Sequence, residues 1–418
     1  MADDGTRTDP SDADHDVLVI GGGPAGSLTA YFLAAEGLDV ALVERDEFPR
    51  FHIGESMSGE ARRILHEAGL ADVIDEASFP RKTGTVVYNG TGQSSFYMPV
   101  MGRSEQGDLT PSRTWQVERS RFDALLLDRA VQAGVSVRRA SAQHPILDGS
   151  DLVGVTVSED DAVADIRARH IVDASGRHAF LSRHGVASRR KTGTWATQTA
   201  IFTHVTGTSR DDDYGDDTRI FYAGPDRWAW FIPIGTDLVS IGIVVPNTEL
   251  RAAGQEPEDF YRTHLSTFHE SLSPLVPEVH FAEPVRTAAN YSYEIEQFVG
   301  PNWLCVGDAH RFVDPIFSFG LTIAVGEAAH ASRAVLRSRA GDTSAIAEFG
   351  EIAAAASDIV EDLVHAFWAR PVAFGVWAHH RHHEDFVDLF AGRIFEHPGS
   401  RGLDAIRAVE RSDRSVAS

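Results

Sequence analysis

The stretch Asp16-Val-Leu-Val-Ile20, followed by Gly21-Gly-Gly-Pro-Ala-Gly26, decides the fold of this chain. Its first part is a short run of apolar, largely β-branched residues, which is typical of a buried parallel strand. The glycine pattern then allows a tight turn, a close approach of the backbone to a pyrophosphate, and close packing of a helix on the strand. Residues 27–36 have helical character, and Val40-Ala-Leu-Val43 is the next predicted strand. The sequence therefore predicts a dinucleotide-binding β-α-β unit.

The end of the second predicted strand carries an acidic residue, Glu44, at the place where such a unit binds ribose hydroxyls. The helix that follows the glycines offers free N–H groups and the positive end of its dipole to phosphates. The pattern alone does not separate NAD from FAD. The predicted dinucleotide-binding residues are Gly21, Gly23, Pro24, Ala25, Gly26, Glu44 and Arg45.

Two later segments favour FAD. Residues 171–176 place a small, sharp turn after a strand, and Val306-Gly-Asp-Ala309 repeats this pattern near the other end of the chain. Asp308, at a strand end, is placed to bind a ribityl hydroxyl, although a simple helix cap is the alternative reading. The helix that follows Gly320 is placed to aim its N-terminus at an anionic flavin edge.

Charge and composition exclude several classes of protein. The chain has 418 residues and a formal net charge of −23, and such an acidic surface repels nucleic acids and anionic membranes. It contains one cysteine, Cys305, which cannot form an internal disulfide and fits a reducing cytoplasm. No apolar stretch is long enough to suggest a membrane-spanning helix. We expect a cytoplasmic protein that binds no nucleic acid.

The order of the predicted elements indicates an α/β fold built from interleaved parts. Dinucleotide-type segments stand at both ends, around a middle whose alternating residues, from 197 to 245, predict an antiparallel sheet. The predicted division is a disordered tail (1–15), a discontinuous dinucleotide-binding domain (16–80, 114–185 and 296–340), an antiparallel substrate domain (81–113 and 186–295) and a helical C-terminal region (341–418).

Several motifs carry a resemblance to a known superfamily. The three glycine-containing segments and Gln116-Val-Glu-Arg-Ser-Arg-Phe-Asp123 resemble FAD-dependent monooxygenases of the para-hydroxybenzoate hydroxylase type. The resemblance implies a GR2-type Rossmann-like FAD domain. It also implies that Arg119 lies near the flavin.

A narrower resemblance is to flavin-dependent halogenases. Trp228-Ala-Trp-Phe-Ile-Pro233 matches their WxWxIP motif, Phe48-Pro-Arg-Phe-His-Ile-Gly-Glu-Ser56 is similar to the segment after their second strand, and Phe312-Val-Asp-Pro-Ile-Phe-Ser-Phe-Gly320 is similar to their flavin-edge segment. On a strand Trp228 and Trp230 share one face, so a packed aromatic pair with a purely structural role is one interpretation. The resemblance implies that they also block direct approach of an organic substrate to the flavin.

The halogenase resemblance also implies a reactive lysine and a halide site. Lys82, in Arg81-Lys-Thr-Gly84, fits the lysine that stands between flavin and substrate, where it binds hypohalous acid or carries the halogen. Burial makes loss of the charge of a lysine easier, which suits this chemistry. Backbone groups of Ser318, Phe319 and Gly320 correspond to the halide site, with Leu321 next to the flavin; Phe319 replaces the usual serine or threonine.

The predicted activity is halogenation, by reduced FAD, O₂ and chloride or bromide, of an electron-rich aromatic substrate that is either free or bound to a carrier protein. A separate reductase would supply the reduced FAD. Two alternatives remain open at this stage. One is a monooxygenase or reductase with direct flavin chemistry, and the other is a flavin-binding protein without turnover.

Other candidate sites are weaker. His379, His382 and His383 have the spacing of metal ligands on a helix. No cysteine lies nearby, and Glu384 is the only close carboxylate, so the case for a metal site is weak. A solvated helix face is the favoured interpretation, and we predict no metal site. The acidic run 211–213 is most simply a solvated loop.

Overall fold

A computed structural model of the chain describes residues 13–160, 162–210, 213–224, 226–395 and 400–408. Strand β1 (His15–Ile20) and helix α1 (Pro24–Ala35) are the first two elements of the predicted unit. The helix begins at Pro24 rather than at residue 27, because proline lacks the N–H that a first helical turn leaves unpaired. Most of the predicted tail lies outside the described residues, and its last residue, His15, already belongs to β1.

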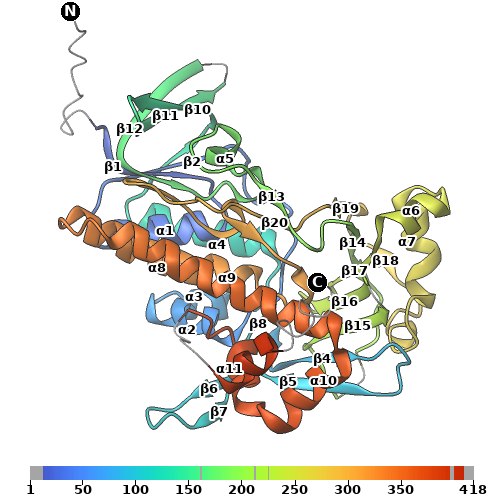
Figure 1. Ribbon diagram of the computed structural model, residues 1–418. Coiled ribbons are helices and arrows are strands. Elements are labelled where there is room, and N and C mark those ends of the chain that lie inside the picture. The colour runs from blue at the N-terminus through green and yellow to red at the C-terminus, as the bar shows by residue number, and fades with distance from the viewer. Residues whose placement is uncertain (1–12, 161, 211–212, 225, 396–399, 409–418) are drawn as a thin grey trace, which may run out of the picture.

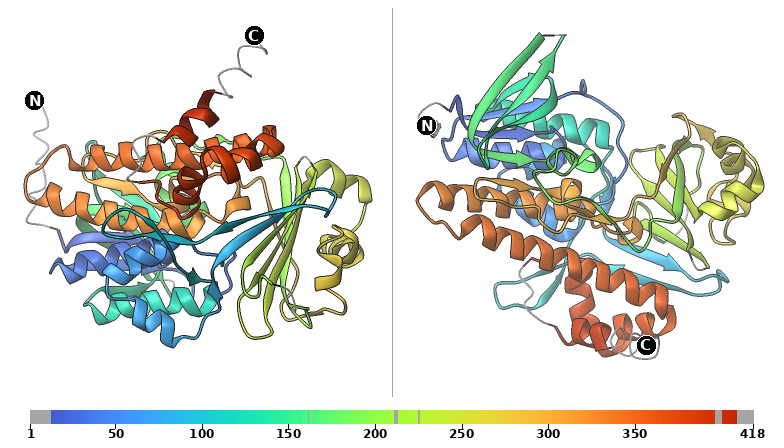
Figure 2. Two further views of the ribbon diagram at one scale, coloured as in Figure 1. Left: turned by 90° about the horizontal axis from the view of Figure 1, so that it is seen from below. Right: turned by 45° about the horizontal axis from the view of Figure 1, so that its top comes forward.

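A parallel sheet forms around β1. It pairs in parallel with β2 and β12, while β9 continues the sheet beyond β2 and β21 continues it beyond β12. The strands are β2 (Val40–Glu44), β9 (Ser136–Arg139), β12 (Ala162–Asp173) and β21 (Trp303–Cys305). The first half of β12 also pairs with an antiparallel hairpin, β10 (Ser141–Asp148) and β11 (Asp151–Glu159), that extends from the body of the molecule (Figure 2).

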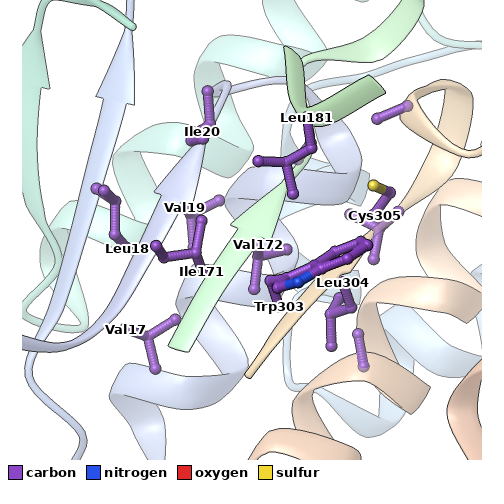
Figure 3. Packing of buried hydrophobic residues seen from close by; sticks show 14 of the residues in the cluster. Val17, Leu18, Val19, Ile20, Ile171, Val172, Leu181, Trp303, Leu304 and Cys305 are labelled. Atoms are coloured by element: carbon purple, nitrogen blue, oxygen red, sulfur yellow. The ribbon is translucent and has the colours of Figure 1, made fainter. Parts of the chain in front are cut away.

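Apolar side chains fill the space between the parallel strands and their helices. Figure 3 shows Val17 and Val19 of β1, Val172 of β12 and Trp303 of β21 in this core. All four are at most 6% exposed. Burying each aliphatic side chain contributes roughly 1.5–3 kcal/mol, so this core fixes the register of the sheet.

The second sheet is mixed rather than purely antiparallel. Its order is β18-β14-β17-β16-β15-β4-β5, and β19 also pairs with β14. All pairs are antiparallel except β15 with β4, because β4 comes from the early segment 81–113 and reaches the sheet through a long crossover. The strands are β4 (Gly84–Tyr88), β5 (Ser95–Pro99), β14 (Gln198–Thr206), β15 (Thr218–Gly224), β16 (Arg227–Pro233), β17 (Val239–Pro246), β18 (His280–Phe281) and β19 (Arg286–Ala289).

Two short helices cover the outer face of the mixed sheet and thereby decide which side chains face inward. Phe260 and Tyr261 of α7 (Pro257–His264) pack in the same cluster as Ile201 and Phe231, and α6 (Asn247–Ala253) precedes them. Tyr261 donates a hydrogen bond to the carbonyl of Ile241 at 3.0 Å. The alternate side chains of β14–β17 therefore point towards the parallel sheet.

Two long helices run across the molecule and connect its halves. Helix α8 (Gly320–Arg339) packs against α1, and α9 (Ala345–Ala369) lies along α8 (Figure 1). The chain then continues through α10 (Pro371–Val376), a π-helical turn (Trp377–Arg381) and α11 (His383–Phe390). None of the helices in the described ranges combines the length and apolarity needed to cross a membrane.

Most of the remaining elements are short. They are α2 (Gly59–Glu67), α3 (Ala71–Glu76), α4 (Arg119–Gln132) and α5 (Phe180–Arg183), the pairs β3 (Arg81–Lys82) with β8 (Thr114–Trp115) and β6 (Met101–Arg103) with β7 (Leu109–Pro111), and β13 (Lys191–Thr192), β20 (Tyr293–Glu294) and β22 (Arg311–Phe312). The domain boundaries predicted above remain a proposal.

Candidate active site

A cavity of about 780 Å³ lies between the two sheets. One wall consists of the carboxyl ends of the parallel strands, where an open α/β sheet binds its ligands. The inward face of β14–β16 forms the opposite wall. The segment 50–56 and the beginning of α8 line the space between them.

The glycine loop forms one end of the cavity. A Cβ on Gly26 would lie 1.9 Å from the carbonyl oxygen of Gly21, so this glycine is required for the close packing of α1 on the sheet. A Cβ on Gly23 would instead meet only the guanidinium of Arg50, at 3.7 Å, and would occupy space beside the start of α1. Pro24 and Ala25 line the cavity at the first helical turn, where N–H groups lack helical partners.

The carboxylate of Glu44 holds this loop in place. It accepts hydrogen bonds from the backbone N–H groups of Gly22 at 2.6 Å and Asp46 at 2.8 Å. Arg45 also lines the cavity, and its largely exposed side chain lies 3.9 Å from Asp46. The loop-holding role of Glu44 is a function that the sequence pattern did not reveal.

Arg119 joins α4 to the segment that crosses the cavity. Its guanidinium pairs with Asp123 at 2.7 Å and donates to the carbonyl of Ile53 at 2.8 Å. Arg50 also pairs with Asp123, at 3.2 Å. Asp123 was not among the predicted site residues, although it ends the quoted Gln116–Asp123 motif.

Asp308 lines the cavity where β21 ends. Burial raises the pKa of its carboxyl to about 6, while the charges of Arg119 and Arg177 act against this shift. The preceding turn is fixed by Glu327 of α8, which accepts from the N–H of Gly307 at 2.6 Å. Glu327 carries no recognisable motif, and only the packing of α8 brings it to this turn.

The predicted halide segment lies at the start of α8. Ser318 has a φ of +60°, and Phe319 is the residue before the helix, with no side chain capping the first turn. Gly320 borders open space, since a Cβ there would have no neighbour within 4 Å. Ser318, Gly320 and Leu321 line the cavity beside Phe319, whose buried ring has its centroid 6.4 Å from that of Phe390 in α11.

These features fit FAD. The space beside Gly23 and the uncapped N-termini of α1 and α8 suit a pyrophosphate and an anionic ring edge, both within one cavity. The carboxyl groups of Glu44 and Asp308 suit sugar hydroxyls. The residues predicted to bind a dinucleotide therefore converge on a single site.

Trp228 and Trp230 stand on the opposite wall. Both are buried, their ring centroids are 5.6 Å apart, and Trp230 donates to the hydroxyl of Ser240 at 3.1 Å. Gly242 makes room for this ring, because a Cβ there would lie 2.2 Å from it. Phe51 stacks on Phe202 beside them, with centroids 6.3 Å apart. The sequence pattern predicted neither Gly242 nor Phe51.

Lys82, at the end of β3, does not itself line the cavity, but it contacts a residue that does. Its side chain is 5% exposed, and its amine donates a hydrogen bond to Ser56 Oγ at 2.9 Å. Ser56 lines the cavity and lies 2.8 Å from Thr218 Oγ1. Burial lowers the pKa of Lys82 to about 8, against the opposing charge of Asp217.

The carboxylate of Asp217 is hydrogen-bonded to other donors. Its carboxylate accepts from the backbone N–H of Gly84 at 2.8 Å and from the Tyr97 hydroxyl at 2.7 Å. Within the described residues no carboxylate is hydrogen-bonded to the amine, which therefore stays easier to deprotonate.

No cluster of three or more potential metal ligands occurs within the described ranges. The C-terminal histidines are divided between two elements, since His379 belongs to the π-helical turn and His383 begins α11. His383 is hydrogen-bonded to the carbonyl of Ala378 at 2.8 Å. Most of the predicted acidic loop, residues 211–212, lies outside the described residues.

Comparison with known proteins identifies the family of this chain. The family model for the FAD binding domain matches residues 14–346. A 1H-pyrrole-2-carbonyl-[peptidyl-carrier protein] brominase of Pseudoalteromonas luteoviolacea is 34% identical, over 96% of this chain and 97% of the relative. A corresponding chlorinase of Pseudomonas fluorescens is 30% identical, over 77% of this chain and 76% of the relative.

Solved structures agree with the sequence comparison. The flavin-dependent brominase Bmp2 has a TM-score of 0.89 and 34% identity, covering 96% of this chain and 99% of that chain. The myxobacterial chondrochloren halogenase CndH has a TM-score of 0.76 and 27% identity, covering 94% and 96%. The predicted cofactor and fold are thereby confirmed, and this chain belongs to the FAD-dependent halogenases.

Proposed function

We propose that this chain halogenates an electron-rich heteroaromatic acyl group, of the pyrrole-2-carbonyl type, attached to a carrier protein. The observation that carries the proposal is the buried Lys82 amine, hydrogen-bonded to a cavity-lining serine at 2.9 Å. The carrier-bound substrate is supported by the names of two relatives, which act on a pyrrole-2-carbonyl group attached to a peptidyl carrier protein. We further propose a cytoplasmic enzyme served by a separate flavin reductase.

In this proposal residues at both ends of the cavity bind FAD. The glycine loop and the N-terminus of α1 bind the pyrophosphate, with Glu44 and Arg45 at the adjoining ribose. Asp308 would bind the ribityl chain and Arg119 would lie near the flavin ring, since both line the same cavity. When bound, reduced FAD would supply two electrons that bring O₂ to the peroxide level, and this oxidant would take two further electrons from the halide to give hypohalous acid and water.

The start of α8 binds chloride or bromide in this scheme. Unpaired backbone N–H groups at Phe319 and Gly320 suit an anion, and their geometry does not depend on the side chain at position 319. Trp228 and Trp230 form the wall that excludes the organic substrate and bulk water from this end. A water-poor interior protects oxidised halogen from hydrolysis.

The Lys82 amine then carries the halogen. The neutral amine attacks the halogen of hypohalous acid: an N–halogen bond forms, the O–halogen bond breaks, and water leaves with the displaced proton. Attack by the aromatic ring on this halogen forms the carbon–halogen bond and breaks the N–halogen bond. The ring loses a proton, and the amine is restored.

The function is tested by product analysis with reduced FAD, O₂, bromide or chloride, and a carrier-bound pyrrole-2-carbonyl substrate. The proposal expects halide-dependent product from the wild-type chain and none from Lys82→Ala or Lys82→Arg, since a guanidinium stays charged. FAD binding should be unchanged in both variants. Oxygenated product without halide, or full activity of Lys82→Ala, would overturn the halogenase chemistry.

The carrier requirement needs its own comparison. The free carboxylic acid and the carrier-bound acyl group are offered at equal concentration, and the products are compared by mass spectrometry. Preferential halogenation of the carrier-bound group supports the proposed substrate. Equal or greater turnover of the free acid excludes the carrier requirement while leaving the chemistry intact.

A further inference from the structure

One long segment of this acidic chain contains no acidic residue. The protein has 61 aspartates and glutamates, yet none occurs between Ala174 and Arg210. The same segment is rich in basic residues, namely Arg177, Arg183, Arg189, Arg190, Lys191 and Arg210. Positive charge is therefore concentrated in this segment, whereas the chain as a whole is negative.

Three of these arginines have no carboxylate partner within the described part of the chain. Arg177, Arg183 and Arg190 are exposed, and none of them forms an ion pair with another described residue. The guanidinium of Arg190 lies 3.7 Å from the ring centroid of Tyr293 and donates to the carbonyl of Arg177 at 2.5 Å. By contrast, the guanidinium of Arg119 donates two hydrogen bonds to the carboxylate of Asp123. Unpaired arginines remain available to an anion from solution.

These arginines gather at the cavity of the proposed cofactor. Arg45, Arg177 and His178 line that cavity. Arg190 is held beside this edge by its hydrogen bond to the carbonyl of Arg177, and Arg183 directly precedes His184, which also lines the cavity. Consistently, burial lowers the pKa of His178, and the charges of Arg183, Arg45 and Arg190 lower it further. We call Arg45, Arg177, Arg183 and Arg190 the basic collar.

We propose that the basic collar captures FAD from solution by attracting its pyrophosphate to the mouth of the cavity. This inference rests on the proposed supply of reduced FAD by a separate reductase. A protein with a net charge of −23 repels a dianion at long range, and a local patch of positive charge offsets that repulsion near the binding site. Such steering acts over about one Debye length, which is roughly 8–10 Å at physiological ionic strength.

Flavin is the occupant that the position of the collar favours. Two of its members line the same cavity as the glycine loop and the N-terminus of α1, where phosphate would finally bind. The collar therefore continues an anion path into the interior. An acidic protein partner would need only surface charge and no such continuity.

The test measures the association rate of FAD with the full chain by stopped-flow flavin fluorescence, over a range of NaCl concentrations. The substitution is Arg183→Glu, because this exposed side chain does not line the cavity. At low salt the association rate constant should fall by roughly threefold to tenfold. The dissociation rate should stay unchanged, and the difference should disappear at about 0.5 M salt, where screening is strong.

Two matched variants separate local charge from other effects. Arg183→Lys keeps the charge and should bind FAD at the wild-type rate. Arg251→Glu makes the same change in net charge on α6, which lies on the outer face of the mixed sheet and does not line the cavity (Figure 1), and it should also leave the rate unchanged. Folding of each variant is checked by circular dichroism and a thermal melt.

Three outcomes would overturn the inference. These are an unchanged association rate in Arg183→Glu, an equal loss in Arg251→Glu, and a loss that appears only when a reductase protein is present. In each of these outcomes the wild-type chain still binds FAD, so the proposed halogenase function stands while the collar inference fails. Failure of the wild-type chain to bind FAD at all would instead contradict the proposed function.

Discussion

The Lys82 amine donates a hydrogen bond to Ser56 Oγ at 2.9 Å, inside the protein. Residues 56 and 82 belong to different segments, and the antiparallel bridge between Ser56 and Gln116 helps to hold the serine in this position. Ser56 lines the cavity, whereas Lys82 is buried and does not line it. The serine therefore sets the position of the amine that the proposed chemistry uses.

Ser56→Ala removes this hydrogen-bond acceptor. We expect halogenation at saturating substrate to fall by roughly fivefold to tenfold, corresponding to about 1 kcal/mol for one hydrogen bond. Loss of the acceptor destabilises the ammonium form, so the pKa of Lys82 should fall further below about 8. The acidic limb of the pH–rate profile should then move to lower pH.

Ser56→Thr is the matched control because it keeps a hydroxyl at the same position. Its pH–rate profile should resemble that of the wild-type chain. A profile that stays in place in Ser56→Ala, in a variant with an unchanged melt, would show that the serine does not act through the lysine.

Lys82→Met should stabilise the folded protein at pH 7. The pKa of Lys82 is about 8 when folded and 10.5 in the unfolded chain, so at pH 7 both states are protonated and the folded state bears a buried charge. Between these two values the unfolded state binds a proton that the folded state lacks, and wild-type stability rises with pH. The difference in favour of Lys82→Met, about 3 kcal/mol below pH 8, should shrink between pH 8 and 10.5.

Chemical denaturation of both proteins at several pH values measures the difference in their free energies of unfolding. Residues that titrate equally in the two proteins make no contribution to this difference. Lys191→Met is a suitable control, since Lys191 is exposed and paired with Glu296. If the difference between Lys82→Met and the wild-type chain is independent of pH, the lysine is not a desolvated cation.

Gly23→Val should abolish FAD binding in a folded protein. The new side chain enters open space beside the start of α1, so it meets the pyrophosphate path rather than the protein. Gly26→Val should instead unfold the chain, because its Cβ would lie 1.9 Å from a backbone oxygen. Flavin absorbance and a thermal melt separate the two effects; a yellow, fully loaded Gly23→Val protein would refute the assignment of the loop.

Trp230→Ala should open the wall between the two ends of the cavity. We expect more hydrogen peroxide to be released per reduced FAD consumed, because oxidising equivalents escape to water before reaching substrate. Loss of packing should cost roughly 3–5 kcal/mol. Phe260→Ala removes a buried ring from the outer face of the same sheet and should lower stability without raising peroxide release. Equal coupling in Trp230→Ala and the wild-type chain would leave Trp230 a purely structural role.

Phe319→Ser should change stability more than halide use. The ring is buried near Phe390, and its loss should cost about 3 kcal/mol. The N–H groups that would bind halide belong to the backbone, so the KM for bromide should change by less than about threefold. A tenfold change of that KM in a folded variant would assign the halide site to the side chain.

The sequence by itself determined the local features of this protein. Glycine at positions 21, 23 and 26 after an apolar strand predicts the dinucleotide turn because backbone geometry and sterics are local properties. Alternation around residues 197–245 predicts the second sheet for the same reason. The Trp228-x-Trp230 spacing placed both rings on one face, as a strand requires.

Only the tertiary structure decided which partners these residues meet. Glu327 and Gly242 carry no motif, yet they position the turn before Asp308 and the Trp230 ring. Ser56 ends a recognisable segment, but nothing in that segment indicates that its hydroxyl binds Lys82. The parallel pairing of β4 with β15 likewise joins segments that are far apart in the chain. Contacts of this kind depend on how helices and sheets pack over long sequence separations, and no local pattern of residues encodes them.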